Sequence, residues 1–148
     1  MTGRARTIRI TLPGYQRDRY RWRRQILRAV LRAKAEAGVT YADEERFEVV
    51  VLLYLKPGKR HDIHDVDNRL KDILDALQGR FGSVRARTRL IEDDRYISRA
   101  VVEKQPIPKA LPENAGGKLL IRPYEPRRWP LQRVKGDPTR KAAAKPTR

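Results

Sequence analysis

Residues 46–55 read RFEVVVLLYL, a nearly continuous run of aliphatic, β-branched and aromatic side chains that Pro57 and Gly58 close. Residue types of this kind favour β-strands. A strand without polar alternation is typical of a sheet that is covered on both of its faces. The stretch therefore predicts the central strand of the domain, and the other elements are expected to pack around it.

Two elements are predicted on the N-terminal side of this strand. Residues 6–12 (RTIRITL) alternate apolar and polar side chains and stop at Pro13-Gly14, which is typical of a short, half-buried strand. Residues 15–37 place apolar side chains near helical spacing among many arginines, and the run ends at Gly38, where a helix-terminating glycine belongs. A long basic helix is predicted there.

The C-terminal side predicts a second helix, a loop and two more strands. Residues 68–77 carry leucine and isoleucine at i, i+3, i+4 and i+7, with Asp67 in the N-cap position. Residues 79–89 (GRFGSVRARTR) contain two glycines and little apolar periodicity, which indicates a mobile basic loop. Residues 96–104 and 118–124 resemble strands, and a Pro- and Gly-containing loop joins them.

The resulting β-α-β-α-β-β order indicates an α/β (α+β) fold, with two main helices against a mixed sheet of about four strands. The length of 148 residues suffices for one core. We therefore expect a single small domain over residues 1–126. Residues 127–148 contain eight basic residues, one acid and three prolines without hydrophobic periodicity, which predicts a disordered basic tail.

The composition restricts the classes of function. Lys and Arg total 35 against 18 Asp and Glu, and the formal charge of +17 favours a polyanionic partner such as nucleic acid. No apolar run is long enough to cross a bilayer and no signal peptide is recognisable, so a cytoplasmic protein without a membrane partner is expected. The chain has no cysteine and two histidines, so a metal would be held mainly by oxygen. Nothing indicates a small-molecule cofactor.

Acidic residues gather at two points of this basic chain, in HDVDN (64–68) and in EDD (92–94). Residues two apart in an extended segment point the same way, so Asp65 and Asp67 are expected to aim their carboxylates at one point. Such a pair repels itself unless a cation lies between, and Mg²⁺ prefers oxygen ligands of this kind. Asp94 is predicted to be the third ligand.

Lys71 adds a basic group to this set. It is expected in the first turn of the short helix, where the helix dipole disfavours a cation, so local stability does not explain it. Beside a phosphate, an ammonium group stabilises the charge that develops during phosphodiester cleavage. Three carboxylates, a divalent cation and this lysine suffice for phosphodiester hydrolysis.

Each of these residues also has an ordinary interpretation. Asp67 alone is more often a helix cap, Asp93 and Asp94 alone a turn, and Lys71 alone a solvated surface charge. His61 and His64 are interpreted as loop residues, with contact to DNA or to a metal-bound water as the alternative. The density of arginines in the long helix and the following loop favours phosphate contact over a merely solvated face. The DNA-binding candidates are Arg17, Arg21, Arg24, Arg80, Arg85, Arg87 and Arg89.

Taken together, the motifs resemble the signature of the RusA family of Holliday-junction resolvases. That family's pattern is D-x-D-N-x-x-K-x-x-x-D-A-L, followed by a D-D pair that opens a strand. Here residues 65–77 read DVDNRLKDILDAL, residues 92–97 read EDDRYI, and ITLPG at residues 10–14 is similar to the family's opening strand. The similar order of elements covers roughly residues 7–124.

The resemblance implies a homodimeric endodeoxyribonuclease that resolves four-way junctions by paired nicks in DNA recombination and repair, using Mg²⁺ or Mn²⁺. It implies Asp65, Asp67 and Asp94 as catalytic metal ligands, Lys71 as the essential lysine, and Asp93 as a further acidic candidate. The loop after the first strand is shorter than in the family, and residues 78–92 are longer and richer in arginine. Cleavage of flaps or forks, or a non-catalytic basic module that coats nucleic acid, are the alternatives.

Overall fold

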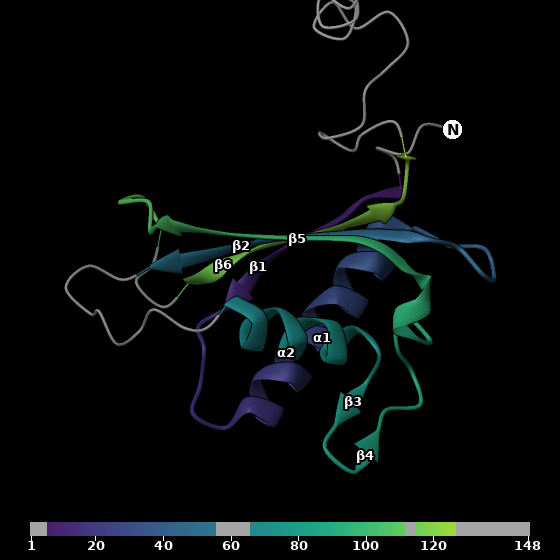
Figure 1. Ribbon diagram of the computed structural model, residues 1–148, viewed down its shortest axis with the longest axis horizontal. Helices are drawn as coiled ribbons and strands as arrows, with labels where there is room; N and C mark the ends of the chain where they lie inside the picture. The colour runs from purple at the N-terminus through teal and green to yellow at the C-terminus, as the bar shows by residue number, and fades with distance from the viewer. Residues whose placement is uncertain (1–5, 56–65, 112–114, 127–148) are drawn as a thin grey trace, which may run out of the picture.

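The order of the secondary-structure elements agrees with the sequence-based prediction. The protein is represented by a computed structural model, which describes residues 6–55, 66–111 and 115–126 (Figure 1). The larger elements are β1 (Ile8–Pro13), α1 (Arg19–Ala37), β2 (Phe47–Leu55), α2 (Val66–Leu77), β5 (Ile97–Pro106) and β6 (Ala115–Pro123). Two short strands, β3 (Arg80–Phe81) and β4 (Val84–Arg85), and the 3-10 helix η3 (Asp94–Tyr96) lie between α2 and β5. The predicted tail, residues 127–148, lies outside the described ranges.

The main sheet is mixed and has the strand order β1-β6-β2-β5. Strand β2 lies inside it, parallel to β5 and antiparallel to β6, and β6 is also antiparallel to β1. The prediction of a small α+β domain with β2 as an interior strand is therefore confirmed. Because β2 and β5 are parallel, the whole segment containing α2, β3, β4 and η3 forms the crossover between them.

Both helices cover the same face of the sheet (Figure 1). The core lies between these layers and contains side chains such as Trp22, Ile26, Val49, Ile73 and Ile121, each at most 1% exposed. No helix of the described ranges spans a membrane, because none is both long and apolar enough.

The sequence predicted that β2 is covered on both faces. This prediction is wrong, because the two helices cover only one face of the sheet. Val50 and Leu52 alternate onto the face opposite the helices and are half-buried. Val50 pairs with Val101 of β5 and Leu120 of β6, so neighbouring strands supply part of its apolar surroundings. Glu48 on the same face is buried by ion pairs with two arginines, Arg99 and Arg122.

Helix α1 begins four residues later than predicted, because Asp18 is its N-cap. The Asp18 side chain accepts hydrogen bonds from the backbone N–H groups of Tyr20 and Arg21, both at 3.1 Å. Gly38 ends the helix with a φ of 65°, as its position in the sequence predicted. Tyr15 therefore lies outside the helix, where its ring packs edge-on against Trp22 at a centroid distance of 5.2 Å.

A buried carboxylate joins α1 to α2. Asp72 is fully buried, and its Oδ1 accepts hydrogen bonds from Arg19 at 3.0 and 3.1 Å and from Arg23 at 2.8 and 2.9 Å. Its Oδ2 accepts a hydrogen bond from Arg69 at 2.8 Å. Arg23 also forms an ion pair with Asp75 at 3.2 Å. These charged contacts fix how α2 lies on α1, and hence which face of α2 remains exposed.

Residues 79–89 contain a small β-hairpin, β3–β4, where the sequence predicted a mobile loop. Phe81 is 7% exposed and lies under the guanidinium of Arg24, which is 5.3 Å from the ring centroid. Arg23 donates a hydrogen bond to the backbone carbonyl of Arg80 at 3.2 Å. The prediction of a mobile loop is therefore not supported, because contacts with α1 hold the hairpin.

Candidate functional site

One face of α2 and the start of η3 form an open groove with a volume of about 260 Å³. Asp67, Lys71 and Asp75 follow one another at helical i, i+4 spacing, so their side chains share one face of α2. Asp94 contributes from the segment that leads into β5. The groove is lined by Asp67, Leu70, Lys71, Leu74, Asp75, Gln78 and Asp94.

Helix α2 places Asp67 and Lys71 differently from the prediction. The helix begins at Val66, two residues earlier than predicted, so Asp67 lies within its first turn and is not the N-cap. Asp67 therefore does not belong to an extended segment, and the expectation that Asp65 points the same way loses its geometric basis. The N-terminal end of the dipole favours a carboxylate at Asp67. Lys71 lies one turn further along α2 and is exposed.

Asp93 and Asp94 have different structural roles. Asp93 caps η3, and its side chain accepts a hydrogen bond from the backbone N–H of Arg95 at 3.1 Å. This bond, followed by a hydrogen bond with the Asp94 side chain, lowers the pKa of Asp93 below its usual value, and the charges of Arg95 and Arg80 act in the same direction. Asp94 lines the groove, whereas Asp93 is not among its lining residues.

Two of the three predicted metal ligands, Asp67 and Asp94, line the same groove as Lys71. Asp65, His61 and His64 lie outside the described residues, so the three-carboxylate set stays a prediction. Within residues 6–55, 66–111 and 115–126, no three acidic, histidine or cysteine side chains are grouped closely enough to hold a metal ion. The donors that line the groove are carboxylate oxygens, which are the ligand type that suits Mg²⁺.

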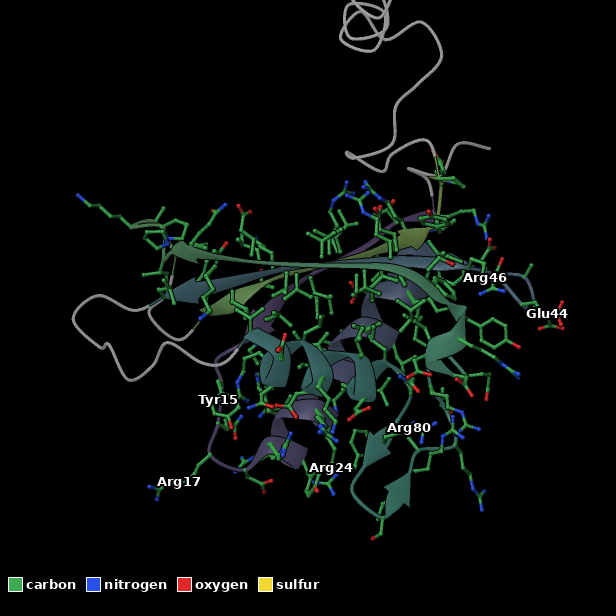
Figure 2. The ribbon with its side chains drawn as sticks, in the orientation of Figure 1. Tyr15, Arg17, Arg24, Glu44, Arg46 and Arg80 are labelled. Carbon is green, nitrogen blue, oxygen red and sulfur yellow. The ribbon has the colours of Figure 1, made fainter. Side chains whose placement is uncertain are left out.

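The predicted DNA-binding arginines are mostly exposed. Arg17 and Arg24 extend from the helical layer away from the sheet (Figure 2). Arg21, Arg80, Arg85 and Arg87 are also exposed. Arg89 is half-buried and forms an ion pair with Glu92 at 3.2 Å, so it is a weaker candidate for phosphate contact than the sequence indicated.

Two hairpin arginines lie at the rim of the groove. Arg80 donates a hydrogen bond to the Gln78 side-chain oxygen at 3.1 Å, and Gln78 lines the groove. Arg85 donates to the backbone carbonyls of Gln78, at 3.4 Å, and of Glu92. Positive charge is therefore placed directly beside the acidic groove. Neither contact could be predicted from the spacing of these residues.

Asp75 and Gln78 also line the groove, although the sequence predicted no role for either of them. The signals for Asp75 are its place in the D-A-L part of the motif and its i+4 spacing from Lys71, which repeats the spacing between Asp67 and Lys71. No protein-family model matches the sequence, and no curated protein sequence matches it. The case for a function therefore rests on the residues of the groove and on the charge around it.

Proposed function

We propose that this protein is a divalent-cation-dependent endodeoxyribonuclease that acts on branched DNA, with the four-way junction as its preferred substrate. The observation that carries the proposal is the groove in which Asp67 and Asp94 line the same space as Lys71. This acidic groove lies in a chain with a formal charge of +17. The motif similarity to the RusA family supports the same function.

The charges of the groove argue against a passive nucleic-acid coat. Carboxylates that face a phosphate weaken binding, so a protein that only coats DNA gains nothing from them. A bound divalent cation removes this conflict, because it attracts both the carboxylates and the phosphate. The surrounding arginines, including Arg80 at the rim, then hold the DNA backbone while the acids hold the ion.

Asp67 and Asp94 would hold Mg²⁺ or Mn²⁺, and Asp65 is the proposed third ligand. When bound, such an ion supplies Lewis acidity toward a phosphoryl oxygen. Lys71 is one helical turn from Asp67, so its ammonium group is available to neutralise negative charge on the scissile phosphodiester. Arg80 at the rim of the groove and Arg24, which lies against Phe81 of the same hairpin, would bind backbone phosphates and so orient the strand.

A homodimer is part of the proposal. A two-fold protein matches the symmetry of a four-way junction and presents two active sites to two equivalent strands. Cleavage of a flap or a fork would need only one groove at a time, so it would not require the two-fold symmetry of a dimer. Cutting rates on junction and fork DNA separate these cases.

The test is incubation of the full-length protein with labelled junction, fork and duplex DNA of equal length, with Mg²⁺ and with EDTA. We expect cutting of the junction in Mg²⁺, none in EDTA, and little cutting of the duplex. Asp67→Asn is expected to abolish cutting while retaining junction binding, because it removes a charged ligand at nearly unchanged size. Asp43→Asn, an exposed acid outside the groove, is the control. Wild-type rates in Asp67→Asn would refute the site.

A further inference from the structure

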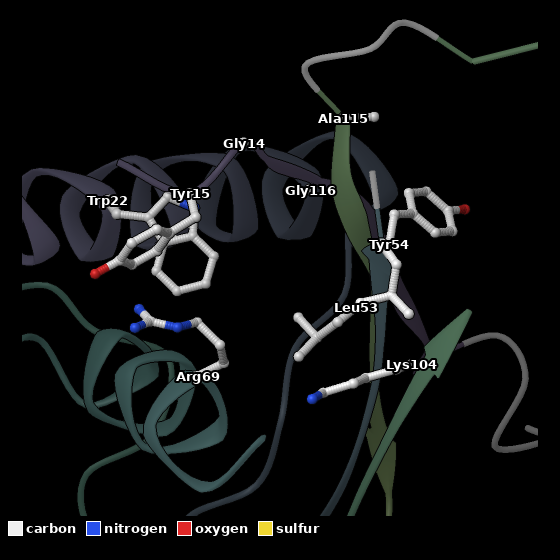
Figure 3. A pocket seen from close by; sticks show the side chains of 10 residues that line it. Gly14, Tyr15, Trp22, Leu53, Tyr54, Arg69, Lys104, Ala115 and Gly116 are labelled. Atoms are coloured by element: carbon white, nitrogen blue, oxygen red, sulfur yellow. The ribbon is translucent and has the colours of Figure 1, made fainter. Parts of the chain in front are cut away.

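A second cavity lies on the other side of α2 from the acidic groove. It has a volume of about 110 Å³ and is formed by the segment after β1, the first turn of α2 and the ends of β2 and β5 (Figure 3). Its lining includes Tyr15, Trp22, Leu53, Arg69 and Lys104. Arg69 is two residues from both Asp67 and Lys71, and residues two apart on a helix do not share a face. The cavity and the groove therefore flank the same helical turn.

The positive and aromatic side chains of this cavity are held in place. The guanidinium of Arg69 lies 3.6 Å from the centroid of the Tyr15 ring, and its Nη1 donates to Asp72 at 2.8 Å. The Trp22 indole N–H donates to the backbone carbonyl of Pro13 at 2.8 Å. Rotamer freedom is thus already restricted before any ligand enters, which lowers the entropic cost of binding.

A glycine shapes the wall of the cavity. A Cβ atom at Gly116 would lie 2.2 Å from the Pro13 carbonyl oxygen, so only glycine allows β6 to approach the end of β1 this closely. Gly116 and Gly14 both line the cavity. Backbone thus replaces bulky side chains on this wall and leaves room beside the Tyr15 and Trp22 rings.

The charges in the cavity select an anion. Arg69 and Lys104 both line it, and no acidic side chain of residues 6–55, 66–111 and 115–126 does. Figure 3 shows Lys104 reaching from β5 toward Arg69 of α2. The Nε of Arg69 is buried and has no hydrogen-bond partner in the part of the chain that the structure describes. This Nε is closed off from solvent, so a ligand would meet Arg69 through the 13% of its side chain that is exposed, and would meet the Lys104 side chain beside it.

We propose that this cavity binds one unpaired nucleotide of the DNA strand, with its base against the exposed ring of Tyr15 and its phosphate between Arg69 and Lys104, while the buried Trp22 reports binding through its edge contact with Tyr15. Aromatic faces stack on any base, and paired cations hold the adjacent phosphate. The inference rests on the proposed function, because it places this nucleotide on the strand that crosses the first turn of α2. Branched DNA offers such nucleotides readily, since bases near a branch cost less to unstack than bases within a duplex.

The test uses the fluorescence of Trp22. The chain has two tryptophans, so Trp129→Phe in the full-length protein leaves Trp22 as the sole reporter. Titrations in EDTA, where no cutting is expected, use single-stranded oligo-deoxythymidine, an abasic chain with the same number of phosphates, and free deoxythymidine monophosphate. We expect saturable quenching by the oligonucleotide and much weaker effects of the other two.

Two matched variants each replace one lysine by glutamine, and the two lysines lie on opposite faces of the sheet. Lys104→Gln is expected to weaken oligonucleotide binding about tenfold, the loss of one charge-assisted hydrogen bond. Lys118→Gln removes the same charge from the exposed face opposite the helices and should leave the affinity unchanged, because Lys118 does not line the cavity. Circular dichroism checks that both variants remain folded.

Three results would overturn the inference: equal quenching by the abasic chain, free monophosphate binding as tightly as the oligonucleotide, or equal losses in Lys104→Gln and Lys118→Gln. A separate cleavage assay in Mg²⁺ distinguishes this failure from failure of the proposed function. Junction cutting without quenching of Trp22 rejects only the nucleotide cavity. Specific quenching without any cutting supports base binding and rejects the nuclease.

Discussion

The substitution Asp72→Asn tests whether the buried carboxylate between α1 and α2 holds the helical layer together. Asp72 is fully buried and receives five hydrogen bonds from Arg19, Arg23 and Arg69, at 2.8–3.1 Å. Asparagine has nearly the same size, but it removes the negative charge and turns an N–H group toward the arginines. The guanidinium groups of Arg23 and Arg69 then remain buried with insufficient negative charge nearby.

The expected loss is about 3–5 kcal/mol in the free energy of unfolding, the range for removing one partner from a buried ion pair. Domains of this size have a total stability of roughly 5–15 kcal/mol, so the change is a large fraction of it. Five charge-assisted bonds place Asp72 toward the upper part of the range. The Arg19 side chain is 44% exposed, so water weakens the ion pair between Arg19 and Asp72.

The assay is urea unfolding followed by far-ultraviolet circular dichroism, with linear extrapolation to water. The control is Asp43→Asn, which changes an exposed acid in the connection between α1 and β2 and should alter stability by less than about 0.5 kcal/mol. A loss below about 1 kcal/mol for Asp72→Asn would show that this carboxylate does not hold the two helices together, because Asp72 would then contribute no more than a surface ion pair.

Further predictions concern the groove, its rim, the tail and one buried tyrosine. Lys71→Ala should lower the cleavage rate about 10²–10³-fold without changing the urea midpoint, and extensive unfolding would show that the exposed lysine has a structural role. Arg80→Ala should weaken junction binding and reduce the slope of log K against log salt by about 0.9; an unchanged slope would exclude a phosphate contact. Removal of residues 126–148 should reduce the same slope further, whereas an identical slope would exclude the tail from the interface. Burial chiefly raises the pKa of Tyr41 to about 12, from 10.0 in an exposed tyrosine. As the pH rises, the unfolded chain therefore loses the Tyr41 hydroxyl proton before the folded protein does. The contribution of Tyr41 to the free energy of unfolding is complete below pH 10 and is lost as the pH rises toward about 12. Unfolding free energies of the wild type and Tyr41→Phe, measured across that interval, should converge, and a constant difference would contradict the assignment.

The periodicity of the sequence predicts the larger elements because each buries one apolar face. The sequence predicts too late a start for α2, because Asp67 satisfies the usual N-cap preference. The helix begins at Val66. The β3–β4 hairpin was missed because strands of two residues show no alternation, and the burial of Phe81 depends on Arg24 of another element. Tertiary contacts of this kind leave no local signal.

In the candidate site, too, the sequence predicts some neighbours from a local motif, whereas others depend on residues far away in the chain. The motif predicted that Asp67, Lys71 and Asp94 lie together, and all three line one groove. Asp72 lies directly after Lys71 in the sequence, yet its role depends on arginines about fifty positions away in α1, and no spacing rule identifies them. The cavity beside Arg69 draws residues from six separate stretches, so only the assembled fold reveals it.

The parallel pairing of β2 with β5 has a consequence for the biosynthesis of the protein. Asp67 and Asp94 come from opposite ends of the crossover that joins these two strands. A nascent chain that has emerged only as far as residue 90 contains α2 but neither Asp94 nor β5, and therefore lacks one wall of the groove. Parallel pairing of this kind forms late because it closes a long loop. The two acids of the groove are thus brought together only after the ribosome has delivered the last strands, so unfinished chains lack the complete acidic groove.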